Sequence, residues 1–223
     1  MKHTQTKELC ARFRKLYMPA VCDALYHLGF AEQVLPTSLR PLFPEKRMVG
    51  RALTVEGRAI EQVNWDEGVE RIRSYLKVFE EIPPDSVIVS VNLNSHVGHF
   101  GELTGNAAQV RGCEGIVLEG NLRDIEGLRA IGFQVFYRDL SPLNAIGRWE
   151  MASTQKPVTI GTVTIYPDDI IFAEFDGILV IPSNQAEQVL TKAEEIAAAE
   201  RHVRKGMKSG LSPLAGLEKH GYI

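Results

Sequence analysis

The residues best suited to chemistry stand at the end of a short apolar run, in the segment Gly120-Asn121-Leu122-Arg123-Asp124. The run before them, GIVLE, has the pattern of a buried strand, and the residues after them have the pattern of a helix. Ligand sites of α/β proteins form at the carboxyl ends of strands, and a helix N-terminus favours anions. Arg123 and Asp124 also have simpler interpretations, as a surface ion-pair partner and a helix N-cap.

A second junction of the same kind occurs earlier in the chain, at Phe100-Gly101-Glu102-Leu103-Thr104. Here too a strand region is followed by a glycine and by an acidic residue that begins a helix. Glu102 is separated from Arg123 by twenty residues. Because the ends of neighbouring strands meet at one edge of a sheet, we predict that the two junctions face one pocket.

Other reactive residue types are present, but their spacing does not favour a catalytic role. His96 and His99 lie three positions apart with no third metal ligand nearby, which favours a loop or supporting role over ligation. Cys113 has no accompanying histidine motif, and we expect a small core residue there. Asp23 is typical of a helix cap or an interface carboxylate.

Hydrophobic periodicity predicts an α/β fold with a βαβ core, a β-rich C-terminal part and helices at both ends. The helices are expected between Thr6 and Leu28 (two, divided at Pro19), and at Trp65–Ile82, Leu103–Arg111, Asp124–Ile131 and Gln185–Lys208. Strands are expected in RALTVEG, in SVIVSVNL, at Gly115–Glu119, at Gln134–Tyr137, and as three short strands in PVTIGTVTIYPDDIIFAEFDGILVIP.

Length and composition indicate one globular domain, residues 1–223, and exclude several classes of partner. A net charge of -3 offers no basic surface for nucleic acid. Three cysteines without CxxC spacing argue against a disulfide framework and a zinc site. The sequence has no apolar run long enough to cross a bilayer and its N-terminus is charged, so we expect a cytoplasmic protein without a membrane partner.

The segment GELTGNAAQVRGCEGIVLEGNLRDIEGLRAIGFQVFYRD resembles the core of the RraA-like family, which includes the HMG/CHA class II pyruvate aldolases. Similar segments are MPAVCDALYHLG, GRALTVEG and GTVTIYPDDIIFAEFDGILVIP, followed by Glu200, Arg204, Met207 and Gly210 at family-like intervals. The resemblance implies the layered α/β/α fold of that family. It also implies a helical N-terminal extension over residues 1–45 and a C-terminal oligomerisation helix over residues 185–223.

The resemblance further implies a divalent-metal-dependent lyase that cleaves 4-hydroxy-2-oxo acids to pyruvate, with oxaloacetate decarboxylation as a possible side reaction. The substrates would be of the 4-hydroxy-4-methyl-2-oxoglutarate or 4-carboxy-4-hydroxy-2-oxoadipate type. Asp124 would be the only protein ligand of Mg²⁺ or Mn²⁺, which binds the oxygen pair of a 2-oxo acid well. Arg123 would stabilise the enolate.

The same resemblance assigns the remaining site residues and an assembly. Backbone N–H groups from Gly101 through Leu103 to Thr104 would hold the substrate carboxylate. Glu102, together with Glu200 from a neighbouring subunit, would order a water that serves as the base. A homo-oligomer follows, either a trimer or a hexamer.

The sequence also departs from the family pattern and leaves alternatives open. Glu119-Gly120 replaces the common Asp-Gly, and Glu102 stands where some relatives carry Asp. Glu194 or Glu195 could take the part of Glu200. Decarboxylation could be the main reaction. A different class of function is a regulator that binds an endoribonuclease without catalysis; the presence of Asp124 favours the enzyme, because regulators of this family lack that carboxylate.

Overall fold

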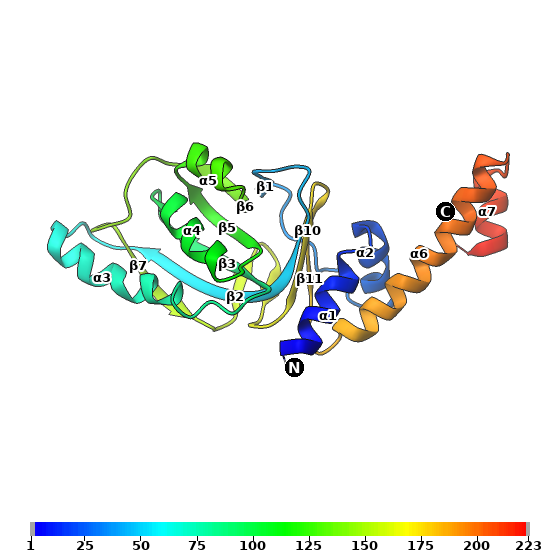
Figure 1. The fold of residues 1–223 in the computed structure, drawn as a ribbon, viewed down its shortest axis with the longest axis horizontal. Helices are drawn as coiled ribbons and strands as arrows, with labels where there is room; N and C mark the ends of the chain where they lie inside the picture. Colours follow the sequence, from blue (N-terminus) through cyan, green and yellow to red (C-terminus); the bar gives the residue numbers. More distant parts are fainter. Residues whose placement is uncertain (1–2, 222–223) are drawn as a thin grey trace.

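The computed structural model describes residues 3–221 and contains a mixed nine-stranded sheet with helices packed on it (Figure 1). The helices are α1 (His3–Phe13), α2 (Met18–His27), α3 (Trp65–Val78), α4 (Glu102–Val110), α5 (Ile125–Ile131), α6 (Ala186–Lys208) and α7 (Pro213–His220). The strands are β1 (Arg40–Pro41), β2 (Met48–Ala59), β3 (Ser86–Leu93), β4 (Gly98–Phe100), β5 (Gly115–Leu122), β6 (Gln134–Leu140), β7 (Trp149–Thr154), β8 (Val158–Ile160), β9 (Val163–Ile165), β10 (Ile170–Glu174) and β11 (Gly177–Ile181). The predicted α/β class is confirmed.

The centre of the sheet is parallel and buried on both faces. The strand order is β1-β6-β5-β3-β2-β10-β11, and β2, β3, β5 and β6 run in the same direction. Continuous apolar runs such as SVIVSVNL are required here, because a parallel strand faces packed layers on both sides. The βαβ core predicted from the sequence is therefore present, with α3 connecting β2 to β3 and α5 connecting β5 to β6.

Alternate residues of β2 show how the two faces are covered. Val49 packs with α1, α2 and α6, and Leu53 and Val55 pack with α3, α4 and α5. Met48 and Ala52 point to the other face, where the β8–β9 hairpin and the connector at Leu35 and Leu39 supply the packing. The period of two along a strand divides the core into these clusters.

The C-terminal strands differ in number and place from the prediction. The segment expected to form three strands forms four, because Gly161 at φ +61° makes a tight turn between β8 and β9. The β-rich C-terminal part is not separate from the rest of the fold, because β10 and β11 join the main sheet, with β10 antiparallel to β2. The short strands β1 and β7 were not predicted, since their few residues carry little periodic signal. The helix expected over residues 185–223 is divided into α6 and α7.

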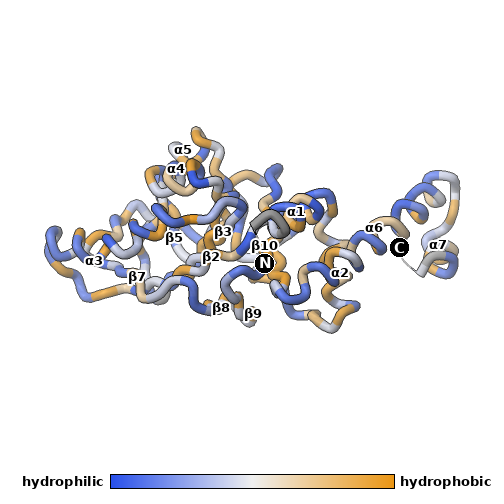
Figure 2. The backbone as a smooth tube through the Cα atoms, turned by 60° about the horizontal axis from the view of Figure 1, so that its bottom comes forward, coloured by the Kyte–Doolittle hydropathy of each residue, from blue (hydrophilic) through white to orange (hydrophobic). Residues whose placement is uncertain are grey.

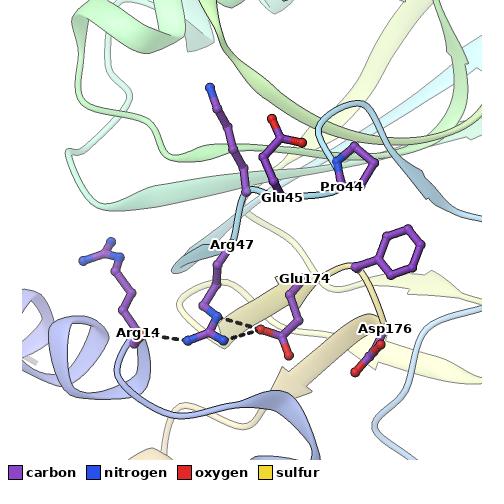
Figure 3. A pocket seen from close by; sticks show the side chains of 8 residues that line it. Arg14, Pro44, Glu45, Arg47, Glu174 and Asp176 are labelled. Carbon is purple, nitrogen blue, oxygen red and sulfur yellow. Dashed lines mark hydrogen bonds and ion pairs between the residues drawn. The ribbon is translucent and has the colours of Figure 1, made fainter.

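The N-terminal helices are fixed to the sheet by Arg47. Its guanidinium donates to the carbonyl oxygens of Arg14 and Leu16, and it forms an ion pair with Glu174 at 2.6 Å (Figure 3). The other carboxylate oxygen of Glu174 accepts from the backbone N–H of Met18 at 3.0 Å. One arginine and one glutamate therefore join the start of α2 to β10. The cavity beside them has a lining of mixed charge, including Lys46 and Asp176.

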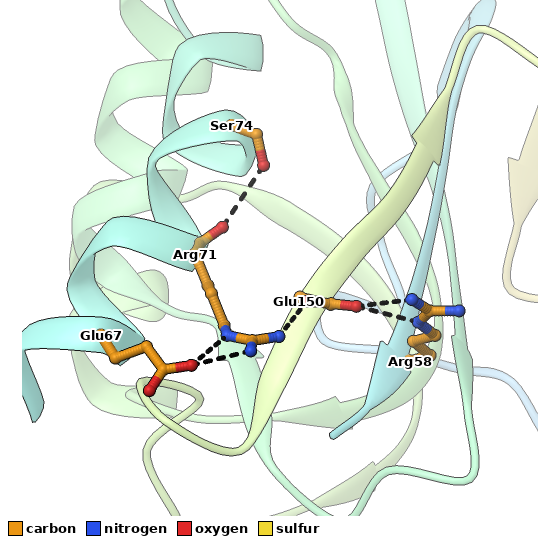
Figure 4. A network of polar contacts seen from close by, with 5 residues as sticks. All are labelled: Arg58, Glu67, Arg71, Ser74 and Glu150. Carbon is orange, nitrogen blue, oxygen red and sulfur yellow. Dashed lines mark hydrogen bonds and ion pairs between the residues drawn. The ribbon is translucent and has the colours of Figure 1, made fainter. Parts of the chain in front are cut away.

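Helix α3 is attached to the sheet by a second charged network. Arg71 on α3 pairs with Glu67 at 2.7 Å and with Glu150 of β7 at 2.9 Å, and Glu150 also pairs with Arg58 of β2 at 2.7 Å (Figure 4). Because Glu150 accepts from two guanidinium groups, its pKa is lowered. This network places the inner face of α3, which carries Ile72 and Tyr75, over β7.

Helix α6 is long and alternates between polar and apolar stretches (Figure 2). Its first half packs on α2, and its second half extends away from the sheet and ends beside α7 (Figure 1). The C-terminal end of α6 consequently lies at the opposite end of the molecule from α3, α4 and α5.

Candidate active site

A cavity of about 290 Å³ lies where α3 faces the two predicted junctions. Of the residues predicted for the site, Gly101, Leu103, Thr104, Arg123 and Asp124 all line it. The rest of the lining comes from α3, from β4 and from the loop after β6, namely Ile72, Tyr75, Leu76, Gly98, His99, Asn144, Ala145 and Ile146. The two junctions thus face one pocket, as the sequence predicts.

The short strand β4 brings the junctions together. It pairs in parallel with the end of β5, with Gly98 opposite Asn121 and Phe100 opposite Leu122. The N–H of Arg123 then donates to the carbonyl oxygen of Phe100 at 3.1 Å. A Cβ on Gly98 would lie 2.9 Å from the Cβ of Arg123, so only glycine permits this approach.

Asp124 occupies the N-cap position of α5 without acting as a cap. Its backbone is left-handed, with φ 57° and ψ 42°, and its side chain makes no capping hydrogen bond. The carboxylate instead lies beside its neighbour, with Oδ1 3.2 Å from Nε of Arg123. Both side chains remain partly exposed, at 34% for Arg123 and 39% for Asp124. Aspartate is among the non-glycine residues that adopt this conformation most readily, and Asp85 and Asp168 also do so in this chain.

Gly101 provides the space beside that carboxylate. A Cβ at position 101 would overlap Oδ2 of Asp124. Thr104 closes the start of α4, because its Oγ1 accepts from the N–H of Gly101 at 3.1 Å and donates to its carbonyl oxygen at 2.9 Å. The N–H of Gly101 is therefore already bonded, and the first-turn N–H groups from Glu102 to Thr104 are the ones that have no partner within the helix.

Glu102 lies close to the site but does not line the cavity. Its Oε2 would be 2.5 Å from a Cβ on Gly127, so its side chain rests against α5. Asn106 Nδ2 lies within 3.3 Å of its carbonyl oxygen and 3.5 Å of its carboxylate. The role assigned to Glu102 stays a prediction.

Glu200 is remote from this cavity within one chain, since it belongs to the second half of α6. Its Oε2 accepts from the hydroxyl of Tyr17 at 2.5 Å and lies 3.4 Å from Arg204. Of the alternatives, Glu194 is held by Arg12 at 2.7 Å and Glu195 pairs with Lys192 at 3.4 Å. Glu200 can therefore act in this site only if it comes from a second chain.

Sequence reasoning left out two aromatic residues that line the cavity, Tyr75 and His99, and Trp149, which packs against them. His99 is buried, its Nε2 lies 2.9 Å from Oγ of Ser90, and its ring stacks on Trp149 with centroids 4.7 Å apart. Tyr75 packs edge-on to Trp149 at 5.0 Å. Burial lowers the pKa of His99 to about 3 and raises that of Tyr75, so both side chains are neutral. The one local signal was a histidine placed between Gly98 and Phe100.

Two polar atoms of this wall have no hydrogen-bond partner in the described residues, Tyr75 Oη and His99 Nδ1. Both are shielded from solvent. Unsatisfied buried polar atoms are rare and costly, and they call for a structural or functional explanation. Cys113, in contrast, is a buried core residue whose pKa is raised to about 11 by burial, consistent with the prediction that it is not a nucleophile.

The residues present fit a hard divalent cation bound mainly by water and substrate. Within residues 3–221 no cluster of three or more His, Cys, Asp or Glu side chains has the geometry of a metal site. Mg²⁺ commonly uses one or two carboxylates together with water and substrate oxygens. Asp124 offers one partly exposed carboxylate, and the missing Cβ of Gly101 leaves space beside it.

The fold and this cavity define a mixed α/β protein with a guanidinium and a carboxylate side by side at the end of β5. The chain belongs to the RraA-like family, described as Aldolase/RraA, whose profile matches residues 18–180. This confirms the resemblance found in the sequence. Within the described part of the chain, no helix is both long and apolar enough to span a membrane.

Two relatives match most of this chain. Protein DlpA of Legionella pneumophila is 30% identical over 192 residues, which is 85% of this chain but only 30% of that protein. A Halalkalibacterium halodurans protein named "Putative 4-hydroxy-4-methyl-2-oxoglutarate aldolase" is 26% identical over 95% of both chains.

Solved structures show the same fold. An uncharacterized protein from Pseudomonas syringae matches with a TM-score of 0.82 and 25% identity, over 96% of this chain and 94% of that one. Streptomyces coelicolor RraAS2, described as an unusual member of the RNase ES inhibitor RraA protein family, matches with a TM-score of 0.75 and 22% identity, over 88% of this chain and 96% of that one.

Proposed function

We propose that this protein is a divalent-metal-dependent lyase that cleaves 4-hydroxy-2-oxo acids to pyruvate. The observation that carries the proposal is the Arg123–Asp124 pair, which lines one cavity together with the glycine-led start of α4. The name of the Halalkalibacterium relative supports the same chemistry. Acids of the 4-hydroxy-4-methyl-2-oxoglutarate and 4-carboxy-4-hydroxy-2-oxoadipate type are the reference substrates, and oxaloacetate decarboxylation is a proposed side reaction.

The start of α4, Asp124 and Arg123 each have a distinct part in binding the substrate. The first-turn N–H groups of α4, at Leu103 and Thr104, hold the substrate carboxylate, since a helix N-terminus attracts anions. Asp124 would hold Mg²⁺ or Mn²⁺. When bound, the cation supplies positive charge that favours the negative charge developing on the 2-oxo oxygen. Arg123 adds a second positive charge that is fixed at any physiological pH.

The reaction breaks the bond between C3 and C4 of the acid. Removal of the proton from the C4 hydroxyl turns C4 into a carbonyl carbon, and the electron pair of the broken bond forms the enolate of pyruvate. Protonation at C3 completes the product. We propose that Glu102 and Glu200 of a neighbouring subunit orient the water that takes the hydroxyl proton.

Pyruvate release from 4-hydroxy-4-methyl-2-oxoglutarate tests this proposal. Activity should need Mg²⁺ or Mn²⁺, should be lost with EDTA, and should return when either cation is added back. Asp124→Asn keeps the size of the side chain but removes its charge, and it should lower kcat/KM by at least about 100-fold. Activity that is indifferent both to EDTA and to Asp124→Asn would contradict the proposal.

The assembly is tested by mixing two inactive variants. If Glu200 acts in the site of a neighbouring chain, Asp124→Asn and Glu200→Gln protomers assembled together should recover part of the activity, because some sites then combine two intact residues. Glu194→Gln is the control, since Arg12 holds that carboxylate within the chain, and it should stay active. A mixture with no more activity than its components would remove Glu200 from the proposal.

The second candidate function is a regulator, which the description of the Streptomyces relative raises for this fold. A regulator would bind an endoribonuclease, and Asp124→Asn would leave that binding unchanged. It would turn over no 2-oxo acid. The pair at Arg123 and Asp124 favours the lyase, because masking a partner enzyme requires no guanidinium and carboxylate side by side in a cavity.

A further inference from the structure

The starts of α4 and α5 contact each other through two pairs, each made of a glycine and a carboxylate. Gly101, at the start of α4, leaves the space in which the carboxylate of Asp124 lies. Gly127, in the first turn of α5, stands in the same relation to Glu102. A Cβ on Gly127 would lie 2.5 Å from Oε2 of Glu102 and 2.8 Å from its Cβ and its Cδ. Each helix start therefore supplies one carboxylate and the glycine that receives the other.

The backbone of α5 does not itself require a glycine at position 127. Gly127 lies within the helix, Ile125–Ile131, and it is not one of the glycines with a positive φ. Glycine inside a helix lowers its stability relative to alanine, and α5 has only seven residues over which to recover that loss. The three atoms nearest to a Cβ at this position all belong to Glu102. The space that the missing side chain leaves is therefore the space that Glu102 occupies.

Asn106 confines the same side chain from within α4. Its Nδ2 lies 3.3 Å from the carbonyl oxygen of Glu102 and 3.5 Å from Oε1 of its carboxylate. The other carboxylate oxygen, Oε2, lies against Gly127. Because Cβ, Cδ and Oε2 of Glu102 all lie close to this glycine, the side chain follows the surface of α5 over most of its length. A methyl group at position 127 would have to displace it.

We propose that Gly127 is a positioning residue of the lyase, which places the Glu102 carboxylate against α5 by leaving space for it. This rests on the proposed function, in which Glu102 and Glu200 of a neighbouring subunit orient the water that takes the proton of the C4 hydroxyl. Asp124 begins the helix that carries Gly127, so one turn of α5 holds the carboxylate for the cation and the surface that places Glu102. A small displacement of a group that orients a reacting water is costly, and the cost falls on kcat.

A double-mutant cycle between positions 102 and 127 tests the proposal, with pyruvate release from 4-hydroxy-4-methyl-2-oxoglutarate and Mg²⁺ as the assay. Gly127→Ala should lower kcat by at least about tenfold and leave KM and Mg²⁺ affinity within about twofold of the wild type, because Arg123 and Asp124 are not displaced. Glu102→Gly removes the whole side chain and should also lower kcat. In that background, adding Gly127→Ala should change kcat by less than about twofold, because no side chain remains for the methyl group to displace.

Ala130→Gly is the control for the helix itself. Ala130 is exposed on α5, so this variant weakens the helix away from Glu102 and should leave kcat unchanged. A loss of kcat by Gly127→Ala that persists in the Glu102→Gly background, together with weaker Mg²⁺ binding, would overturn the proposal, because the methyl group would then act by moving Asp124.

The remaining outcomes separate this proposal from the lyase function. Wild-type kcat in Gly127→Ala or in Glu102→Gly would overturn the positioning role and leave the lyase function standing. A Gly127→Ala chain without the circular dichroism spectrum of the folded protein would do the same, since the fold would then account for the glycine. Absence of pyruvate release by the wild-type protein would overturn the lyase function and this proposal with it.

Discussion

Gly101 and Asp124 come from different junctions of the sheet, yet a Cβ atom on Gly101 would overlap Oδ2 of Asp124. The glycine lies at the N-cap of α4 and the aspartate at the N-cap of α5. The φ of Gly101 is -158°, an extended value that any residue adopts, so the backbone conformation does not require glycine at this position. The requirement comes from the neighbouring carboxylate.

Gly101→Ala should therefore displace the Asp124 carboxylate while leaving the fold intact. We expect a loss in kcat/KM of about 100-fold, similar to that of Asp124→Asn, because a small displacement of a catalytic group is costly. Mg²⁺ or Mn²⁺ affinity measured by calorimetry should fall in parallel, and the circular dichroism spectrum should not change. Wild-type cation affinity in Gly101→Ala would show that the carboxylate has room to move.

The left-handed backbone of Asp124 predicts an order of stability between two inactive variants. Asp124→Gly and Asp124→Ala both remove the carboxylate, but only glycine adopts φ 57° without strain. The free energy of unfolding in urea should be higher for Asp124→Gly by about 1 kcal/mol. Equal stabilities would mean that the backbone at 124 relaxes when the side chain is removed.

The unsatisfied hydroxyl of Tyr75 predicts a stabilising substitution. Tyr75→Phe keeps the aromatic packing on Trp149 and removes a buried polar atom that has no partner in the described residues. The free energy of unfolding should rise by about 1 kcal/mol. Tyr26→Phe is the control, because Tyr26 is 70% exposed, and it should change stability by less than about 0.5 kcal/mol. Destabilisation by Tyr75→Phe would indicate that the hydroxyl is hydrogen-bonded in solution.

The charged network at α3 predicts a pH-dependent contribution from Glu150. Arg58 and Arg71 lower its pKa below the ordinary value of 4.5, so the folded state binds this proton more weakly than the unfolded chain. Its contribution is complete at neutral pH, declines as the pH falls below the ordinary value, and is lost once the pH is below the lowered pKa.

Glu150→Gln should accordingly be less stable than the wild type at pH 7, and this difference should shrink as the pH falls below the ordinary value of 4.5. Urea unfolding at pH 7 and at a series of pH values below 4.5 measures the difference. Glu70→Gln, at an exposed ion pair on α3, should show little change at any of these pH values. A difference for Glu150→Gln that persists at low pH would assign the effect to packing instead of charge.

The sequence by itself determined the elements whose signal is local. Strand β3 was predicted at its observed bounds, Ser86–Leu93, because a strand buried on both faces is mainly apolar and reads as one run. The two junctions were also visible, since glycine, acidic residues and a change of period mark where a strand ends and a helix begins. The Arg123–Asp124 pair was found in this way.

Only the tertiary structure decided which residues surround that pair. The pairing of β4 with β5 brings the junctions to one cavity. Tyr75 and His99, which are far apart in the sequence, both line it, and Trp149 packs against the two of them. Glu102 turns toward Gly127, away from the cavity lining, and Glu200 lies on a helix that leaves the sheet. Periodicity reports the local environment of a segment, whereas contacts between distant segments depend on how the layers pack, which no local pattern encodes.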